Sequence, residues 1–194
     1  MYTDLLDKGY ACLRRGDPEA ALMRFQHASE LEPDRPQAYF ALAMAYLELG
    51  TGEKVVQSLE AALRVDPTYV AARAYLGVEY FKRYEVHRAE DELARALQDE
   101  PTNLLVRIKY AEYYYRLGFY NRSVELLEDG LKSPHGANEH IVAMARQLLT
   151  QARQKSRNII LREPPDPRRW LRLLTWLRPR KRRDAAAAGK VELS

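Results

Sequence analysis

A period of 34 residues runs through most of this chain and constrains its fold more than any other feature. Prolines recur at that interval, at Pro33, Pro67 and Pro101. Four further sets keep the same interval, namely Gly9, Ala43, Gly77 and Ala111; Ala28, Ala62, Ala96 and Gly130; Cys12, Tyr46, Tyr80 and Tyr114; and Gly16, Gly50, Tyr84 and Gly118. A repeat of this length is one supersecondary unit that cannot bury its apolar face alone. The sequence therefore predicts that neighbouring units stack into a solenoid.

The small residues at two positions of each unit indicate that a unit is a pair of closely packed helices. Glycine in a helix interior costs about 0.5–1 kcal/mol relative to alanine, and a helix bears that cost where a second helix approaches closely. Each proline falls just beyond the second helix, where the missing N–H ends a helix. The pattern predicts an all-α chain of paired helices, each of about 12–15 residues, joined at the turn positions.

The residues at the repeated positions resemble the tetratricopeptide repeat, whose signature combines an aromatic residue, Leu-Gly, Tyr, Ala, Phe and Pro. The third unit contains Leu76, Gly77, Tyr80, Ala89, Leu93, Ala96 and Pro101; the second contains Tyr39, Leu42, Ala43, Tyr46, Val55, Leu59, Ala62 and Pro67; the first contains Leu5, Gly9, Ala21, Phe25, Ala28 and Pro33; and the fourth contains Tyr110, Ala111, Tyr114, Ser123, Leu127 and Gly130. The first unit departs from the signature at Lys8 and Cys12, and the fourth carries Pro134 one residue early. The resemblance covers roughly residues 2–136. It implies a right-handed solenoid of four helical hairpins that binds other proteins, and it names no particular partner.

A further helix is expected from Glu139 to about Arg157. Its apolar residues recur at helical spacing, at Ile141, Val142, Ala145, Leu148, Leu149 and Ala152. The other face carries Glu139, Arg146, Gln147, Gln151 and Arg153. One polar and one apolar face is what the open end of a solenoid requires. We therefore interpret residues 139–157 as a capping helix and residues 1–157 as one solenoid domain.

The tetratricopeptide phase places one side of each first helix on a concave groove. The resemblance puts nine candidate binding residues there: Leu6, Tyr10, Phe40, Met44, Leu47, Val78, Phe81, Tyr115 and Arg116, and the same phase adds Leu13, Ala74, Ile108 and Glu112. Family members that bind the acidic C-terminal tails of heat-shock chaperones carry Lys, Arg and Asn on this face. The matching positions here are Leu6, Tyr10, Met44, Ala74 and Val78, so that carboxylate clamp is absent. An apolar groove favours a helical or extended peptide with apolar side chains.

Residues 158–194 are predicted to form a separate basic tail. Residues 1–151 hold 18 basic and 23 acidic side chains, a net charge of −5, whereas residues 152–194 hold 13 and 4, a net charge of +9. The segment Glu163-Pro164-Pro165-Asp166-Pro167 separates the tail from the capping helix. A short amphipathic helix is expected over residues 167–178, with Trp170, Leu173, Leu174 and Leu177 on one side and Leu171 and Trp176 at its flanks. Arg180, Lys181, Arg182 and Arg183 follow.

Four interpretations of the tail remain open. Two tryptophans, an apolar face and flanking basic residues favour a peripheral anchor on an anionic membrane surface. The same apolar face would suit docking on another protein or in the groove of this chain. The basic run over residues 168–183 would suit nucleic acid, although no aromatic interleaving or recognised motif accompanies it. The fourth interpretation is a solvated end without structure.

The sequence indicates no enzymatic chemistry. The four histidines are scattered, and no phosphate-binding glycine loop, nucleophile elbow or pair of catalytic carboxylates is found. No metal or other cofactor is expected. The acidic run Glu90-Asp91-Glu92 is interpreted as a solvated helix face.

A cytoplasmic location is predicted. The sequence has no apolar run of 18 residues, so no spanning helix is expected, and its first residues lack the segments of a signal peptide. The single cysteine, Cys12, occupies a core position of the first unit. If the tail binds lipid, the protein would lie peripherally at the inner face of the membrane.

Together these features favour a non-enzymatic scaffold or adaptor. It would hold a helical or extended peptide of unknown identity in its groove and be tethered to a membrane by its C-terminal helix. The alternative is a nucleic-acid-associated protein that uses residues 168–183 as a basic arm.

Overall fold

The computed structural model describes residues 1–134 and 137–158, and every regular element in those ranges is an α-helix. The helices are α1 (Tyr2–Arg14), α2 (Pro18–Leu31), α3 (Pro36–Glu48), α4 (Gly52–Val65), α5 (Val70–Lys82), α6 (Val86–Asp99), α7 (Leu104–Leu117), α8 (Tyr120–Lys132) and α9 (Glu139–Asn158). The predicted all-α class is confirmed for the part of the chain that is described. The predicted helix over residues 167–178 lies outside it.

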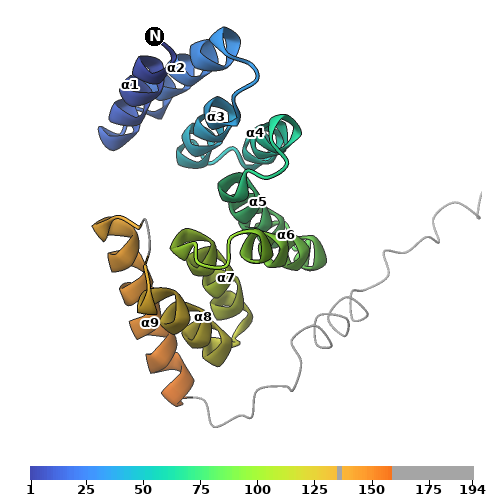
Figure 1. Ribbon diagram of the computed structural model, residues 1–194, viewed down its shortest axis with the longest axis vertical. Coiled ribbons are helices and arrows are strands. Elements are labelled where there is room, and N and C mark those ends of the chain that lie inside the picture. Colours follow the sequence, from blue (N-terminus) through green and yellow to red (C-terminus); the bar gives the residue numbers. More distant parts are fainter. Residues whose placement is uncertain (135–136, 159–194) are drawn as a thin grey trace, which may run out of the picture. The chain divides into compact units, whose positions relative to one another are not determined.

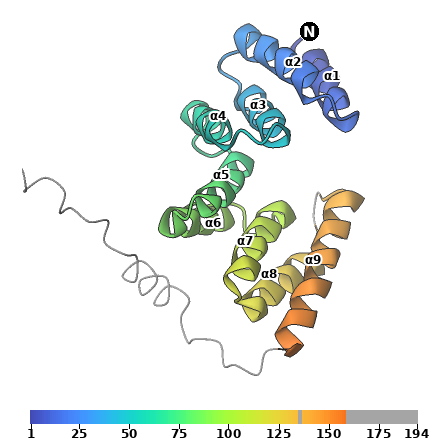
Figure 2. The same cartoon turned by 180° about the vertical axis from the view of Figure 1, so that it is seen from behind.

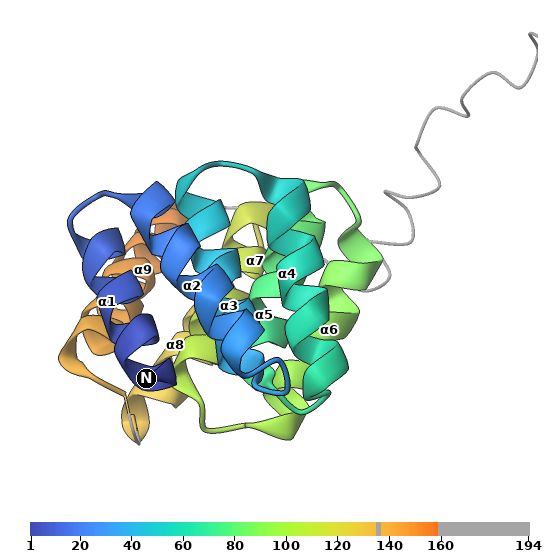
Figure 3. The same cartoon turned by 90° about the horizontal axis from the view of Figure 1, so that it is seen from above.

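The helices pack as consecutive pairs, as the 34-residue period predicts (Figure 1). Within a pair, α1 packs on α2, α3 on α4, α5 on α6 and α7 on α8. Each second helix also packs against the first helix of the next pair, and α9 packs against α8 and α7. The same succession can be followed from behind in Figure 2 and from above in Figure 3. The unit of the fold is therefore the helical pair, stacked on its neighbours.

Local sequence explains where the helices begin and turn. Asp17 precedes α2, and its side chain accepts a hydrogen bond of 3.0 Å from the Ala20 amide. Asn103 precedes α7 and accepts from the Leu105 amide at 2.9 Å. The turn between the helices of each pair uses a left-handed residue, with φ values of 76° at Gly16, 68° at Gly50, 61° at Tyr84 and 86° at Gly118. The predicted turn positions are thus confirmed, with tyrosine in place of glycine in the third unit.

The core repeats with the same period as the sequence. Phe25, Leu59, Leu93 and Leu127 have no exposed surface, and neither do Ala28, Ala62 and Ala96. The small residues on the first helices meet these side chains. A Cβ atom built on Gly77 would lie 2.7 Å from Leu93 Cγ, well inside the contact distance of two carbon atoms. The close approach that the small residues predict is present.

Helix α9 has one buried side and one exposed side. Ala145, Leu149 and Ala152 are buried, whereas Glu139 and Arg146 are exposed. The helix runs from Glu139 to Asn158, the last residue that the structure describes, and so includes the range expected for the capping helix. Its role as the end of the solenoid domain, with a boundary at residue 157, stays a prediction.

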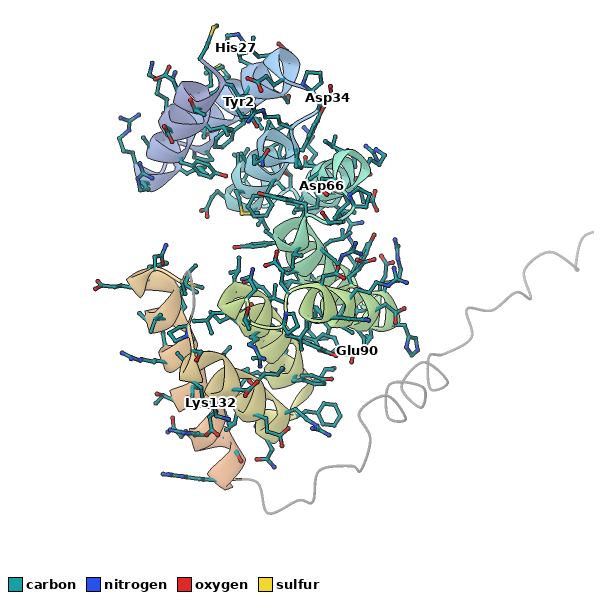
Figure 4. The ribbon with its side chains drawn as sticks, in the orientation of Figure 1. Tyr2, His27, Asp34, Asp66, Glu90 and Lys132 are labelled. Carbon is teal, nitrogen blue, oxygen red and sulfur yellow. The ribbon has the colours of Figure 1, made fainter. Side chains whose placement is uncertain are left out.

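Two expectations from the sequence were wrong. Glu90 is 5% exposed and accepts a hydrogen bond from the Tyr110 hydroxyl, so the run that begins there is not a uniformly solvated face (Figure 4). Ala74 and Ile108, placed on the groove by the repeat phase, are 0% and 1% exposed and belong to the core. In both cases the pattern within one helix predicts an exposed side chain, and packing of a neighbouring element buries it. None of the described helices is long and apolar enough to cross a membrane.

Candidate peptide-binding surface

The nine predicted groove residues all lie on the first helices of the four pairs. We call them the groove row: Leu6 and Tyr10 on α1; Phe40, Met44 and Leu47 on α3; Val78 and Phe81 on α5; and Tyr115 and Arg116 on α7. The first eight are half-buried and Arg116 is exposed. Side chains that the core leaves half-buried on the first helices of four successive pairs offer a surface for a ligand. Their role in binding stays a prediction.

Aromatic contacts join the groove row from one unit to the next. The Phe40 ring meets the Tyr75 ring edge-on, with 5.4 Å between centroids, and the Tyr69 ring at 5.6 Å. The Phe81 ring meets Tyr113 in the same way at 5.2 Å. Such pairs hold their rings in fixed orientations. The first contacts join α3 to the start and middle of α5, and the last joins α5 to α7.

The N-terminal part of the groove row is held against the core. Leu6 and Tyr10 pack on the buried cluster that contains Cys12 and Phe25, and the Tyr10 and Phe25 rings meet edge-on at 5.1 Å. Burial raises the pKa of the Tyr10 hydroxyl to about 12. Tyr10 therefore stays neutral at physiological pH and presents an uncharged surface.

The C-terminal part of the surface is charged. The Lys109 ammonium lies 4.7 Å from the centre of the Tyr75 ring and 3.4 Å from the Glu112 carboxylate. The side chains of Lys109 and Glu112 are 11% and 29% exposed. Tyr75 and Lys109 were not among the residues predicted for the groove, because the repeat phase of each helix puts both one position away from it. The contact between Tyr75 and Lys109 depends on how the third and fourth units meet, and the contact between Tyr75 and Phe40 depends on how the second and third units meet.

The described residues offer no metal centre. No group of three or more His, Cys, Asp or Glu side chains in residues 1–134 and 137–158 could hold a metal ion. His27, His87 and His140 are each exposed on a different helix. The buried cysteine, Cys12, belongs to the core of the first two units.

Comparison with known proteins relates this chain to one repeat family. The profile described as "Tetratricopeptide repeat" matches residues 13–75. The mouse interferon-induced protein with tetratricopeptide repeats 3 is 27% identical over 130 residues, which cover 66% of this chain and 32% of that protein. The type IV pilus assembly protein PilF of Pseudomonas aeruginosa is 30% identical over 90 residues, which cover 46% of this chain and 36% of that protein. The chain thus spans about a third of the length of these relatives.

Solved structures share the fold at low sequence identity. The APC/C hetero-tetramer Cut9–Hcn1 matches with a TM-score of 0.71 and 15% identity over 80% of this chain and 30% of that one. The first repeat domain of Spaghetti, solved with the HSP90 peptide SRMEEVD, matches with a TM-score of 0.54 and 20% identity over 60% of this chain and 92% of that one. At these identities the likeness concerns the arrangement of helices alone.

Proposed function

Because this chain is a tetratricopeptide repeat protein, we propose that it is a non-enzymatic scaffold whose groove row binds a helical or extended peptide of a partner protein. The observation that carries the proposal is the groove row itself. Eight side chains, six of them apolar and the other two the tyrosines Tyr10 and Tyr115, remain half-buried on four separate helices. A solved neighbour of the same fold holds a peptide, which supports a peptide as the kind of ligand.

The preferred ligand is an amphipathic helix. Burying one Leu- or Phe-sized side chain contributes about 1.5–3 kcal/mol as an upper bound, and association costs about 4–15 kcal/mol. A specific complex therefore needs anchors along most of the groove row. Met44 is unbranched and can adapt to different partners. No Lys, Arg or Asn occupies the positions that would clamp a terminal carboxylate, so an acidic tail is a poor ligand.

Affinity capture with a matched pair of variants tests this function. Met44 lies in the groove row, whereas Met23 on α2 is 67% exposed outside it. Met44→Glu should lose the partners that the unchanged chain retains, because a charge would be buried in the complex. Met23→Glu adds the same charge and should retain them. Equal recovery by the two variants would show that the groove row is not the binding surface.

We propose further that the tail tethers the scaffold to the inner face of a membrane from the cytoplasmic side. The support is in the sequence of residues 167–183, where apolar residues at helical spacing precede four basic residues. Each basic residue near an anionic surface contributes about 1 kcal/mol, and such anchors generally need both signals. The tail lies outside the described residues.

The alternative function is association with nucleic acid through residues 168–183. The concentration of positive charge in the tail favours it. A chain that ends at Glu163 separates the two roles. Loss of binding to anionic vesicles supports the tether, whereas loss of salt-sensitive retention on nucleic acid supports the alternative.

A further inference from the structure

A pocket of about 240 Å³ adjoins the groove row between the second and third helical pairs. Leu47, at the end of α3, belongs to both the row and the pocket. The turn after α3 and the start of α4 form one wall, and the last turn of α5 forms the other. A peptide that covers Leu47 would therefore pass the mouth of this pocket.

A buried carboxylate, that of Glu79, lines the pocket. Its side chain is 5% exposed, and one oxygen, Oε1, lies 2.5 Å from the Lys82 ammonium, whose side chain is 43% exposed. The other oxygen, Oε2, faces Gly52, where a Cβ atom would lie 3.7 Å away. One and two periods earlier the same position holds Ala45 and Ala11, and one period later it holds the buried Tyr113, so no other unit places a charge there. A buried carboxylate is costly without a partner, and repeat packing at this position does not require one.

We propose that the Glu79 pocket binds a basic side chain, arginine or lysine, of the peptide held by the groove row. This inference rests on the proposed function and adds the chemistry of its ligand. Lys82 already places a cation on Glu79 Oε1, and its half-exposed, flexible stem can return its ammonium to water when another cation arrives. A guanidinium in its place would bind both carboxylate oxygens, which a lysine ammonium does not do.

The walls of the pocket suit the stem of such a side chain. The Tyr46 ring and Leu47 offer apolar surface to the methylene groups. The absence of a side chain at Gly52 leaves the approach to Oε2 open. Arg83, the other cation among the lining residues, donates a 2.9 Å hydrogen bond to the Gly52 carbonyl.

Two series of synthetic peptides test the inference on the full chain. Both carry leucines at helical positions i, i+3, i+4 and i+7, one with a single arginine moved around the flank of the apolar face and the other with glutamine at the same places. Isothermal titration should give a Kd for the best arginine peptide about tenfold lower than for its glutamine partner. Glu79→Gln should abolish that preference and leave the affinity for the glutamine peptide within about twofold.

Three further variants make the result specific. Glu30→Gln removes the same charge from an exposed site on α2 and should keep the preference. Lys82→Met should enlarge the preference for the arginine peptide, because this variant lacks the cation that competes for Glu79. Gly52→Leu fills the pocket from the wall opposite Glu79 and should reduce the preference for the arginine peptide. This variant tests the inference even if Glu79→Gln proves unstable in a thermal melt.

The outcomes separate the pocket from the groove. Binding of both peptides with equal affinity, or a preference for arginine that survives Glu79→Gln, overturns the inference and leaves the proposed function standing. A loss of affinity for both peptides in Lys82→Met would show that the ion pair is structural, and would also overturn it. If neither series binds the unchanged chain, the proposed function fails and the inference fails with it.

Discussion

At Gly77 the two helices of the third pair approach so closely that a side chain has no room. A Cβ atom there would lie 2.7 Å from Leu93 Cγ and 3.1 Å from the Ala89 carbonyl oxygen. Gly77→Leu should therefore lower the free energy of unfolding by about 1–3 kcal/mol or more, through overpacking. Denaturant titration measures the change. Ala143→Leu, the matched control at an exposed position of α9, should change it by less than about 0.5 kcal/mol. An unchanged midpoint for Gly77→Leu would mean that the helices can separate at no cost.

Tyr84 is a tyrosine in a backbone conformation that the other three turns give to glycine. Its φ is 61°, and its side chain is 78% exposed. The left-handed region costs a non-glycine residue about 1–2 kcal/mol. Glycine removes this cost, but it also raises the conformational entropy of the unfolded chain, which offsets part of the gain. Tyr84→Gly should thus stabilise the fold by up to about 1 kcal/mol, seen as a higher denaturant midpoint. A lower midpoint would show that contacts of the tyrosine side chain outweigh the backbone strain.

A buried polar cluster joins the third and fourth pairs. Glu90 on α6, labelled in Figure 4, accepts hydrogen bonds from two hydroxyls on α7, those of Tyr110 at 2.5 Å and Tyr114 at 3.1 Å. Desolvation, followed by the charge of Glu90, raises the pKa of both Tyr110 and Tyr113 above the ordinary 10.0. Deprotonation of these hydroxyls in the folded state would place further negative charge beside a buried carboxylate.

This cluster predicts a loss of stability at alkaline pH. Because the folded pKa is raised, the contribution of the two tyrosines is fully present below the unfolded pKa of about 10 and is lost as the pH rises above it. The loss is about 1.4 kcal/mol per tyrosine for each pH unit. Denaturant titrations at pH 8.5 and 11 should show a smaller decrease for Tyr110→Phe with Tyr113→Phe than for the unchanged chain. Parallel decreases in both proteins would rule out this cluster as the cause.

The sequence predicted the parts of the fold that repeat. Turn, small and proline positions express local backbone and packing physics, and the fixed period identified them even where one unit departs, as at Tyr84. The sequence did not predict features that only one of the four units has. Glu79 and Glu90 are buried by neighbouring units, and nothing in the helix that carries them distinguishes them from surface acids. The Tyr75–Lys109 contact was missed for the same reason. The groove row was derived from the repeat phase, and two of its neighbours, Ala74 and Ile108, proved to be core.

The whole chain combines an acidic repeat region with a basic tail, and the tail is expected to bind anionic membranes. Trp170→Glu together with Leu174→Glu should release the protein from anionic vesicles at ordinary salt, because the basic run alone is too weak a signal. Co-sedimentation with the vesicles measures this. Val191→Glu with Leu193→Glu adds the same charge near the C-terminus and should leave binding intact. Tryptophan emission that is already blue-shifted without lipid, and that ignores added vesicles, would instead favour docking of the tail on a protein surface.

Binding by the groove row is the central claim, and a direct titration of the full chain with two peptides tests it. The first is a synthetic amphipathic helix with leucines at i, i+3, i+4 and i+7, and the second is the acidic peptide SRMEEVD, which the Spaghetti domain holds. We predict that the helix binds at least about tenfold more tightly, and that Phe40→Glu or Phe81→Glu abolishes its binding while a thermal melt shows the variant to be folded. Tighter binding of SRMEEVD, lost on Arg116→Ala and insensitive to Phe40→Glu, would contradict the account and indicate a charge clamp.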